Sequence, residues 1–179
     1  MLPVKTLASL AGLAALLFLI REGNRSTYDI ASEKFPLAQA ARAGNLALVE
    51  EALRDHPNVN QSDDLMGNTA LHWATSFEAA DRGTIRERVA IVQELLKRKA
   101  DPNKRNLSGE APIYRAVWNP ELTEALLKGG AAIEEGVVDR TPLISATFLG
   151  GSLCFGAAES MHVLIKAGAK VNAQEKSGW

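Results

Sequence analysis

The side chains that could carry chemistry in this chain are few and far apart. Its three histidines, His56, His72 and His162, and its single cysteine, Cys154, do not stand at the short spacings that zinc ligands adopt. Cys154 has an apolar, glycine-rich neighbourhood without the positive charge that stabilises a thiolate. The sequence contains neither a phosphate-binding loop nor a nucleophile elbow. We therefore expect no enzymatic activity, no bound metal and no cofactor.

The charge balance argues against nucleic acid as a partner. The chain has 20 basic and 21 acidic side chains and an isoelectric point near 6.3, which leaves no basic stripe for a phosphate backbone. Basic residues do gather between positions 82 and 105. We assign most of them to the solvated side of a helix, with contact to nucleic acid or lipid headgroups as the alternative.

The first residues have the character of an export segment. Residues 7–20 carry no charge and follow Lys5, and Arg21 comes directly after them. This apolar run is shorter than the roughly 20 residues that a membrane span prefers. Because no small-x-small cleavage site follows Ile20, we favour an uncleaved signal anchor over a signal peptide for residues 1–25. The remainder is then expected in the periplasm or at the inner membrane, with residues 1–20 in contact with lipid if they are not cleaved.

The elements that position any site are indicated by two motifs that recur along the chain. Openings stand at Asp64–His72 and Arg140–Ala146, and closings at Ala100–Asn103 and Gly168–Asn172. This pattern resembles the ankyrin repeat, which runs over about 33 residues. The resemblance implies an all-α solenoid of about four helix-turn-helix repeats within a domain at 26–179. We place the repeats at about 35–63, 64–105, 106–136 and 137–173, and the start of a fifth at 174–179. There we favour a truncated chain over a natural chain that lacks a capping helix.

Two repeats contain extra residues between their helices. In the second repeat, Thr84 and Glu87 stand at the spacing of a capping box, so we expect a long helix to begin near Ile85. In the fourth repeat, the glycine-rich segment Gly150–Gly156 predicts a loop. His72 matches the histidine of the ankyrin opening, which implies a structural role in bonding the turn backbone and the Thr69 hydroxyl.

The resemblance also implies where a partner binds, because ankyrin repeats use their turns and the ends of their first helices. Large apolar side chains recur at these positions, which should face solvent, and such a patch is typical of a protein-binding surface. For Phe77, an alternative is that the ring anchors the inserted segment behind it. The predicted partner-binding residues are Leu65, Met66, Asn68, Phe77, Leu107, Trp118, Val138 and Arg140.

These features predict a non-enzymatic scaffold that acts by steric binding of a partner protein. The chain resembles exported bacterial ankyrin-repeat proteins, which implies an immunity protein against a secreted toxin such as a type VI secretion lipase effector. The alternative is a periplasmic accessory or scaffold protein in stress defence, with a periplasmic enzyme as its partner. A purely structural tethered scaffold, with no single tight partner, is a third possibility.

Overall fold

Helices form in pairs along the chain, and each pair falls within one predicted repeat. The computed structural model describes residues 35–55, 58–77, 84–134, 140–150 and 156–172, all within a compact unit that begins at Phe35. The predicted signal segment, the start of a fifth repeat, His56, Val138 and Cys154 lie outside the described residues. Within the described ranges, no helix combines the length and apolar character needed to cross a membrane.

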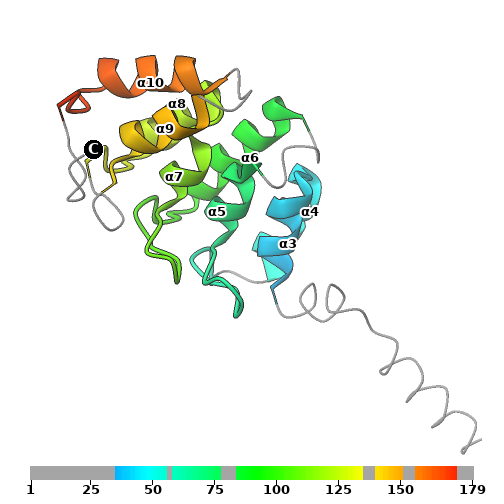
Figure 1. Cartoon of the computed structure of the whole chain (residues 1–179). Coiled ribbons are helices and arrows are strands. Elements are labelled where there is room, and N and C mark those ends of the chain that lie inside the picture. The colour runs from blue at the N-terminus through cyan, green and yellow to red at the C-terminus, as the bar shows by residue number, and fades with distance from the viewer. Residues whose placement is uncertain (1–34, 56–57, 78–83, 135–139, 151–155, 173–179) are drawn as a thin grey trace, which may run out of the picture. The chain divides into compact units, whose positions relative to one another are not determined.

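The four helix pairs form two parallel rows (Figure 1). The inner row contains α3 (Pro36–Ala43), α5 (Ala70–Thr75), α7 (Pro112–Ala116) and α9 (Pro142–Gly150), each packed on the next. The outer row contains α4 (Leu46–Asp55), α6 (Ile85–Lys97), α8 (Pro120–Lys128) and α10 (Gly156–Lys166). In the described part of the chain, extended structure is limited to an isolated bridge at Arg140. This arrangement confirms the prediction of an all-α stack.

Small residues allow the inner helices to approach one another closely. An alanine stands at the same position in every inner helix, and all four alanines are buried: Ala40, Ala74, Ala116 and Ala146. The outer helices contribute larger apolar side chains to the same continuous core, among them Leu95, Leu126 and Leu164. Because each pair buries its apolar face against its neighbours, the stack is a single cooperative scaffold.

The local signals in the sequence explain where several helices begin. Thr84 Oγ1 accepts the Glu87 amide at 3.2 Å, and the Glu87 carboxylate accepts the Thr84 amide at 2.9 Å. These bonds form the predicted capping box and start α6 at Ile85, as expected. The Thr84 amide and hydroxyl both donate to the Glu87 carboxylate, at 2.9 and 3.0 Å, and these two bonds lower the pKa of the exposed Glu87 carboxyl. In α8, the Asn119 side chain accepts the Leu122 amide in the same manner.

The two end residues of the predicted glycine-rich loop of the fourth repeat belong to helices. Gly150 is the last residue of α9, and Gly156 is the first residue of α10. A side-chain carbon at Gly156 would lie 2.3 Å from the Trp118 carbonyl oxygen. The close approach of the α10 backbone to Trp118 therefore requires glycine at this position. The residues between these two glycines lie outside the described part of the chain.

Candidate partner-binding surface

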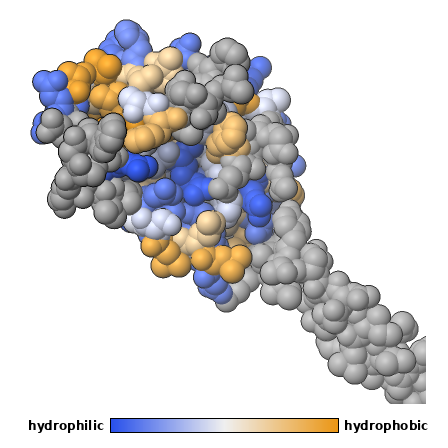
Figure 2. All heavy atoms as spheres, viewed as in Figure 1, coloured by the Kyte–Doolittle hydropathy of each residue, from blue (hydrophilic) through white to orange (hydrophobic). Residues whose placement is uncertain are grey.

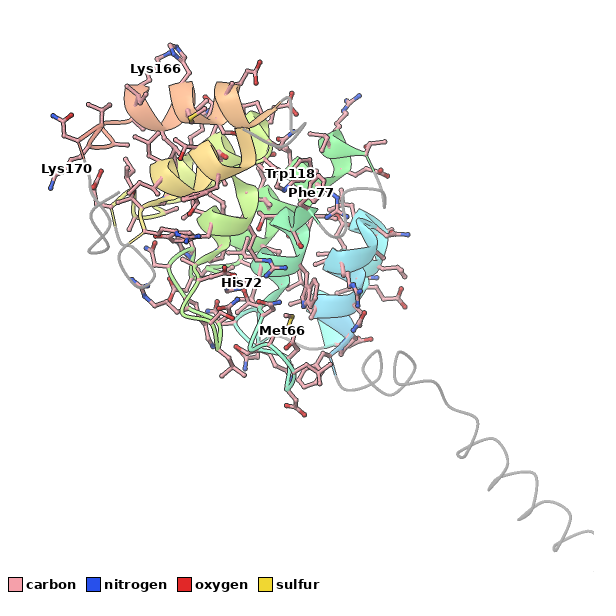
Figure 3. The ribbon with its side chains drawn as sticks, viewed as in Figure 1. Met66, His72, Phe77, Trp118, Lys166 and Lys170 are labelled. Atoms are coloured by element: carbon pink, nitrogen blue, oxygen red, sulfur yellow. The ribbon has the colours of Figure 1, made fainter. Side chains whose placement is uncertain are left out.

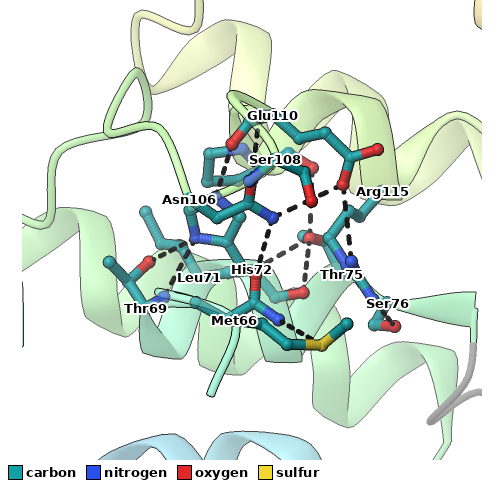
Figure 4. Close-up of polar contacts among 12 residues, drawn as sticks. Met66, Thr69, Leu71, His72, Thr75, Ser76, Asn106, Ser108, Glu110 and Arg115 are labelled. Atoms are coloured by element: carbon teal, nitrogen blue, oxygen red, sulfur yellow. Dashed lines mark hydrogen bonds and ion pairs between the residues drawn. The ribbon is translucent and has the colours of Figure 1, made fainter. Parts of the chain in front are cut away.

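The turn before α5 is joined to the turn before α7 through a buried histidine (Figure 4). His72 Nδ1 accepts the Thr69 amide at 3.1 Å and lies 2.8 Å from the Thr69 hydroxyl. Because Nδ1 accepts, the proton is on Nε2, which donates to the Glu110 carbonyl at 2.9 Å. Burial of the ring lowers the pKa of His72 to about 4, so the imidazole is neutral at pH 7. The predicted structural role of His72 is confirmed.

Two asparagines complete the connection between these turns. The Asn106 amide donates to Asn68 Oδ1 at 2.9 Å, and Asn106 Oδ1 accepts the amides of Ser108 and Glu110. Asn68 is fully buried, so its predicted position on a solvent-facing surface is wrong. Its side chain is turned inward because the neighbouring turn supplies the amide hydrogen that its oxygen requires.

The tips of these turns expose apolar side chains. Leu65 and Leu107 are 78% and 76% exposed, and Met66 is 44% exposed. The Leu107 amide donates to the Met66 carbonyl at 2.9 Å, which holds the two tips side by side. Gly67 has a φ of +69°, and a side-chain carbon there would lie 2.9 Å from Leu107 Cγ. Orange spheres at the lower edge of Figure 2 lie where the turns protrude in Figure 1.

An aromatic pair stands at the other end of α5. The rings of Phe77 and Trp118 meet edge to face, with centroids 5.6 Å apart. Trp118 is half-buried and its indole nitrogen donates to the Thr75 carbonyl at 2.8 Å, whereas Phe77 is 57% exposed. Trp118 therefore fixes the position of Phe77, and Phe77 presents apolar surface to solvent.

A charged cluster surrounds the ring of Trp73, a residue of α5 that is only 8% exposed. Trp73 Nε1 donates to Asp63 Oδ2 at 2.8 Å. The guanidinium carbons of Arg42 and Arg115 lie 4.8 and 5.7 Å from the centroid of the Trp73 ring. Arg115 also donates to the Ser76 hydroxyl at 3.0 Å. This cluster was not predicted from the sequence, although Trp73 and Arg115 hold the same position in α5 and α7.

The fourth repeat presents a smaller set of exposed groups. The Arg140 guanidinium lies 4.6 Å from the centroid of the Phe148 ring, and both residues are exposed. The Tyr114 hydroxyl donates to the Arg140 carbonyl. Tyr114 holds the position in α7 that corresponds to His72 in α5, and it makes the equivalent bond to the next turn.

The structure thus places most of the predicted contacts in two groups, which lie at opposite ends of α5. Leu65, Met66 and Leu107 stand at the turn tips, and Phe77 and Trp118 form the aromatic pair. Arg140 lies in the fourth repeat, just before α9. Among the residues that the structure describes, no group of histidine, cysteine and acidic side chains has the geometry to hold a metal ion. Two open grooves, of about 480 and 470 Å³, lie along the outer helices and contain neither histidine nor cysteine.

Comparisons with known proteins point to a common repeat. A model of the ankyrin repeat matches residues 66–107. The chain is 32% identical over 151 residues to human transient receptor potential cation channel subfamily A member 1. The matched region covers 82% of this chain and 12% of that protein. It is 35% identical over 119 residues to human NF-kappa-B inhibitor delta, covering 64% of this chain and 36% of that protein. The chain therefore spans only a minor part of each of these relatives.

Proposed function

The chain carries ankyrin repeats, and from that premise we propose that it is a non-enzymatic scaffold that binds a partner protein through its turn tips and inner helices. The observation that carries this proposal is the group of exposed apolar side chains on the second and third repeats. Leu65 and Leu107 are more than three-quarters exposed, and hydrogen bonds hold their turns together. A contiguous apolar surface of this kind is stabilised when a partner covers it.

The mechanism is steric and depends on a preformed surface. Asn106 and His72 fix the two turns relative to each other before any partner arrives. Because the turns are already ordered, little conformational entropy is lost on binding, and more of the apolar contact contributes to affinity. Catalysis is not required for such a protein to hold, block or position its partner.

The proposal is tested by capturing the partner from the native organism with the full chain as bait. In the test variant, Leu65, Met66 and Leu107 are each changed to serine. The matched control has Leu48→Ser and Ile165→Ser, two apolar residues that are 46% exposed on the outer helices α4 and α10. Circular dichroism establishes that both variants fold.

We expect the unaltered chain and the control to capture the same protein, and the turn variant to bind it at least tenfold more weakly. Burial of a leucine or methionine side chain contributes about 1.5–3 kcal/mol, so the loss of three should be readily measured. Equal capture by the turn variant and the control would place the partner on another face of the stack.

The uncharged apolar run at residues 7–20 supports a finer proposal, in which the repeats meet their partner outside the cytoplasm. This location is tested by measuring how much of the full chain sediments with membranes and how much is degraded by protease added to spheroplasts. A protease-resistant chain in the soluble fraction of the spheroplasts would contradict this location.

Within that location, we propose that the partner is a secreted toxin, such as a type VI secretion lipase effector, and that the chain neutralises it. A rigid surface that covers part of a toxin can prevent its action without any chemistry. The captured protein is expressed with an export signal in cells with and without the chain. Growth arrest that the chain relieves supports immunity. A captured protein that is harmless to cells contradicts it and favours the accessory role in stress defence.

A further inference from the structure

The charged cluster around Trp73 has a fixed geometry. Both Asp63 carboxylate oxygens are occupied, one by Trp73 Nε1 at 2.8 Å and the other by the Met66 amide at 2.8 Å. These bonds set the orientation of the indole ring against which the Arg42 and Arg115 guanidinium groups lie. Arg115 is held further by the Ser76 hydroxyl and, at 3.5 Å, by Glu110. The cluster therefore presents its positive charge in a defined place.

Arg42 is the member of the cluster whose charge is directed to a partner. In the described part of the chain, no carboxylate lies within ion-pair distance of its guanidinium, which stacks on Trp73. The backbone of Arg42 is fixed, because the buried Arg88 side chain donates to its carbonyl at 3.3 Å and to the Ala74 carbonyl at 3.0 Å. An arginine stacked on an indole keeps the donors at its edge available for a carboxylate.

Apolar groups flank this charge in both directions along α5. Figure 3 places Met66 and Phe77 at opposite ends of this helix, with His72 between them. The six residues of α5 span about 9 Å, and Met66 and Phe77 lie beyond its two ends, so an extended peptide needs at least about three residues to reach from one to the other. A peptide segment can therefore place an acidic side chain at the cluster and an apolar side chain at each end.

We infer that this surface recognises an extended acidic segment of its partner protein, in which a Glu or Asp binds Arg42 and nearby apolar side chains contact Met66 and Phe77. The inference rests on the proposed partner-binding function and assigns the chemistry of the segment bound. Arg115 lies against the same ring, where its bonds to Ser76 and Glu110 hold it, and the Glu110 carboxylate offsets part of its charge.

The inference is tested with two phage-displayed libraries of short random peptides that differ in one fixed central residue, Glu in one and Gln in the other. Both are selected on the immobilised full chain. The best Glu peptide is then synthesised in both forms, and its affinity is measured by fluorescence anisotropy. We expect the Glu form to bind about tenfold or more tightly, because a hydrogen bond between two charged groups is stronger than one to a neutral amide.

Variants assign that preference to Arg42. Arg42→Leu should bind both forms equally, and Arg42→Lys should keep part of the preference for Glu. The control is Arg98→Leu, which removes the same charge from an exposed position on the outer row, where Arg98 is paired with Glu94. It should leave the preference unchanged.

Three results would overturn the inference. Glu and Gln peptides of equal affinity would mean that the partner is not recognised through an acid, although the capture experiment with the turn variant could still succeed. The absence of selected peptides in both libraries would refute recognition of a short segment. A single-stranded oligonucleotide that binds the full chain and is lost in Arg42→Leu would make nucleic acid the ligand. Loss of the partner in the capture experiment is scored separately and tests the proposed function itself.

Discussion

Acid should weaken the junction between the second and third repeats through a single titrating group. His72 is buried and uncharged, and burial holds its pKa at about 4, below the 6.5 of an exposed histidine. In the unfolded chain, His72 takes up a proton as the pH falls below 6.5. The folded chain resists this protonation until the pH approaches 4. Because the unfolded state binds more protons in this window, stability is present above pH 6.5 and is lost as the pH falls toward 4.

The magnitude follows from the difference between the two pKa values. A shift from 6.5 to about 4 corresponds to about 3.4 kcal/mol when fully expressed, at 1.36 kcal/mol per pKa unit. Between pH 7 and pH 5, roughly 2 kcal/mol of this is lost. That interval lies mostly above the titration of ordinary carboxyl groups, so His72 can be observed with little interference.

The assay is urea unfolding of the full chain at several values between pH 7 and pH 5, followed by circular dichroism. The test variant is His72→Gln, which removes the titrating group at position 72. The control is His162→Gln, which changes an exposed histidine on α10. The unaltered chain and the control should lose roughly 2 kcal/mol more than His72→Gln over this interval. The same pH dependence in all three proteins would refute the reasoning.

Three further changes test the local structure by urea unfolding. Gly67→Ala should cost about 1–2 kcal/mol, because a side chain is strained at a φ of +69° and contacts Leu107; an unchanged stability would mean that the turn adapts. Thr84→Ala should cost about 1 kcal/mol by removing the cap of α6, whereas Thr84→Ser should keep most of it; equal losses would contradict a capping role. Tyr114→Phe should cost about 1 kcal/mol, because it removes the donor to the Arg140 carbonyl, and no loss would show that water replaces that bond.

Features that depend on residues close together in the sequence were predictable. The capping box joins Thr84 to Glu87 within one helical turn, so its spacing alone fixes the start of α6. The match of His72 to the ankyrin pattern likewise implied its bonds to Thr69 and the turn backbone. Repetition of the openings and closings predicted the stack of helix pairs, because each pair needs a neighbour to cover its apolar face.

Features that depend on distant residues were not predictable in the same way. Asn68 stands at a turn position, but its side chain turns inward to accept the amide of Asn106, which is 38 residues away. The cluster at Trp73 requires side chains from α3, α5 and α7 to meet on one surface. Equivalent positions in successive helices place residues in a row, but they do not specify which side chains stack or hydrogen-bond. The groups that recognise a partner in such a scaffold therefore come from several repeats rather than from one.

The residues at the His72 position give the junctions between repeats different responses to acid. His72 bonds the second repeat to the Glu110 carbonyl, and Tyr114 bonds the third repeat to the Arg140 carbonyl. In α9, Ile144 holds the same position and has no side-chain donor. The Tyr114 hydroxyl has no basic nitrogen to take up a proton in acid, so its junction keeps its bond where the imidazole of His72 becomes protonated in the unfolded chain. The junction that weakens is the one that aligns Leu65, Met66 and Leu107. Because a stacked repeat protein transmits stability mainly between neighbours, acid should weaken the junction between the second and third repeats more than the junction between the third and fourth.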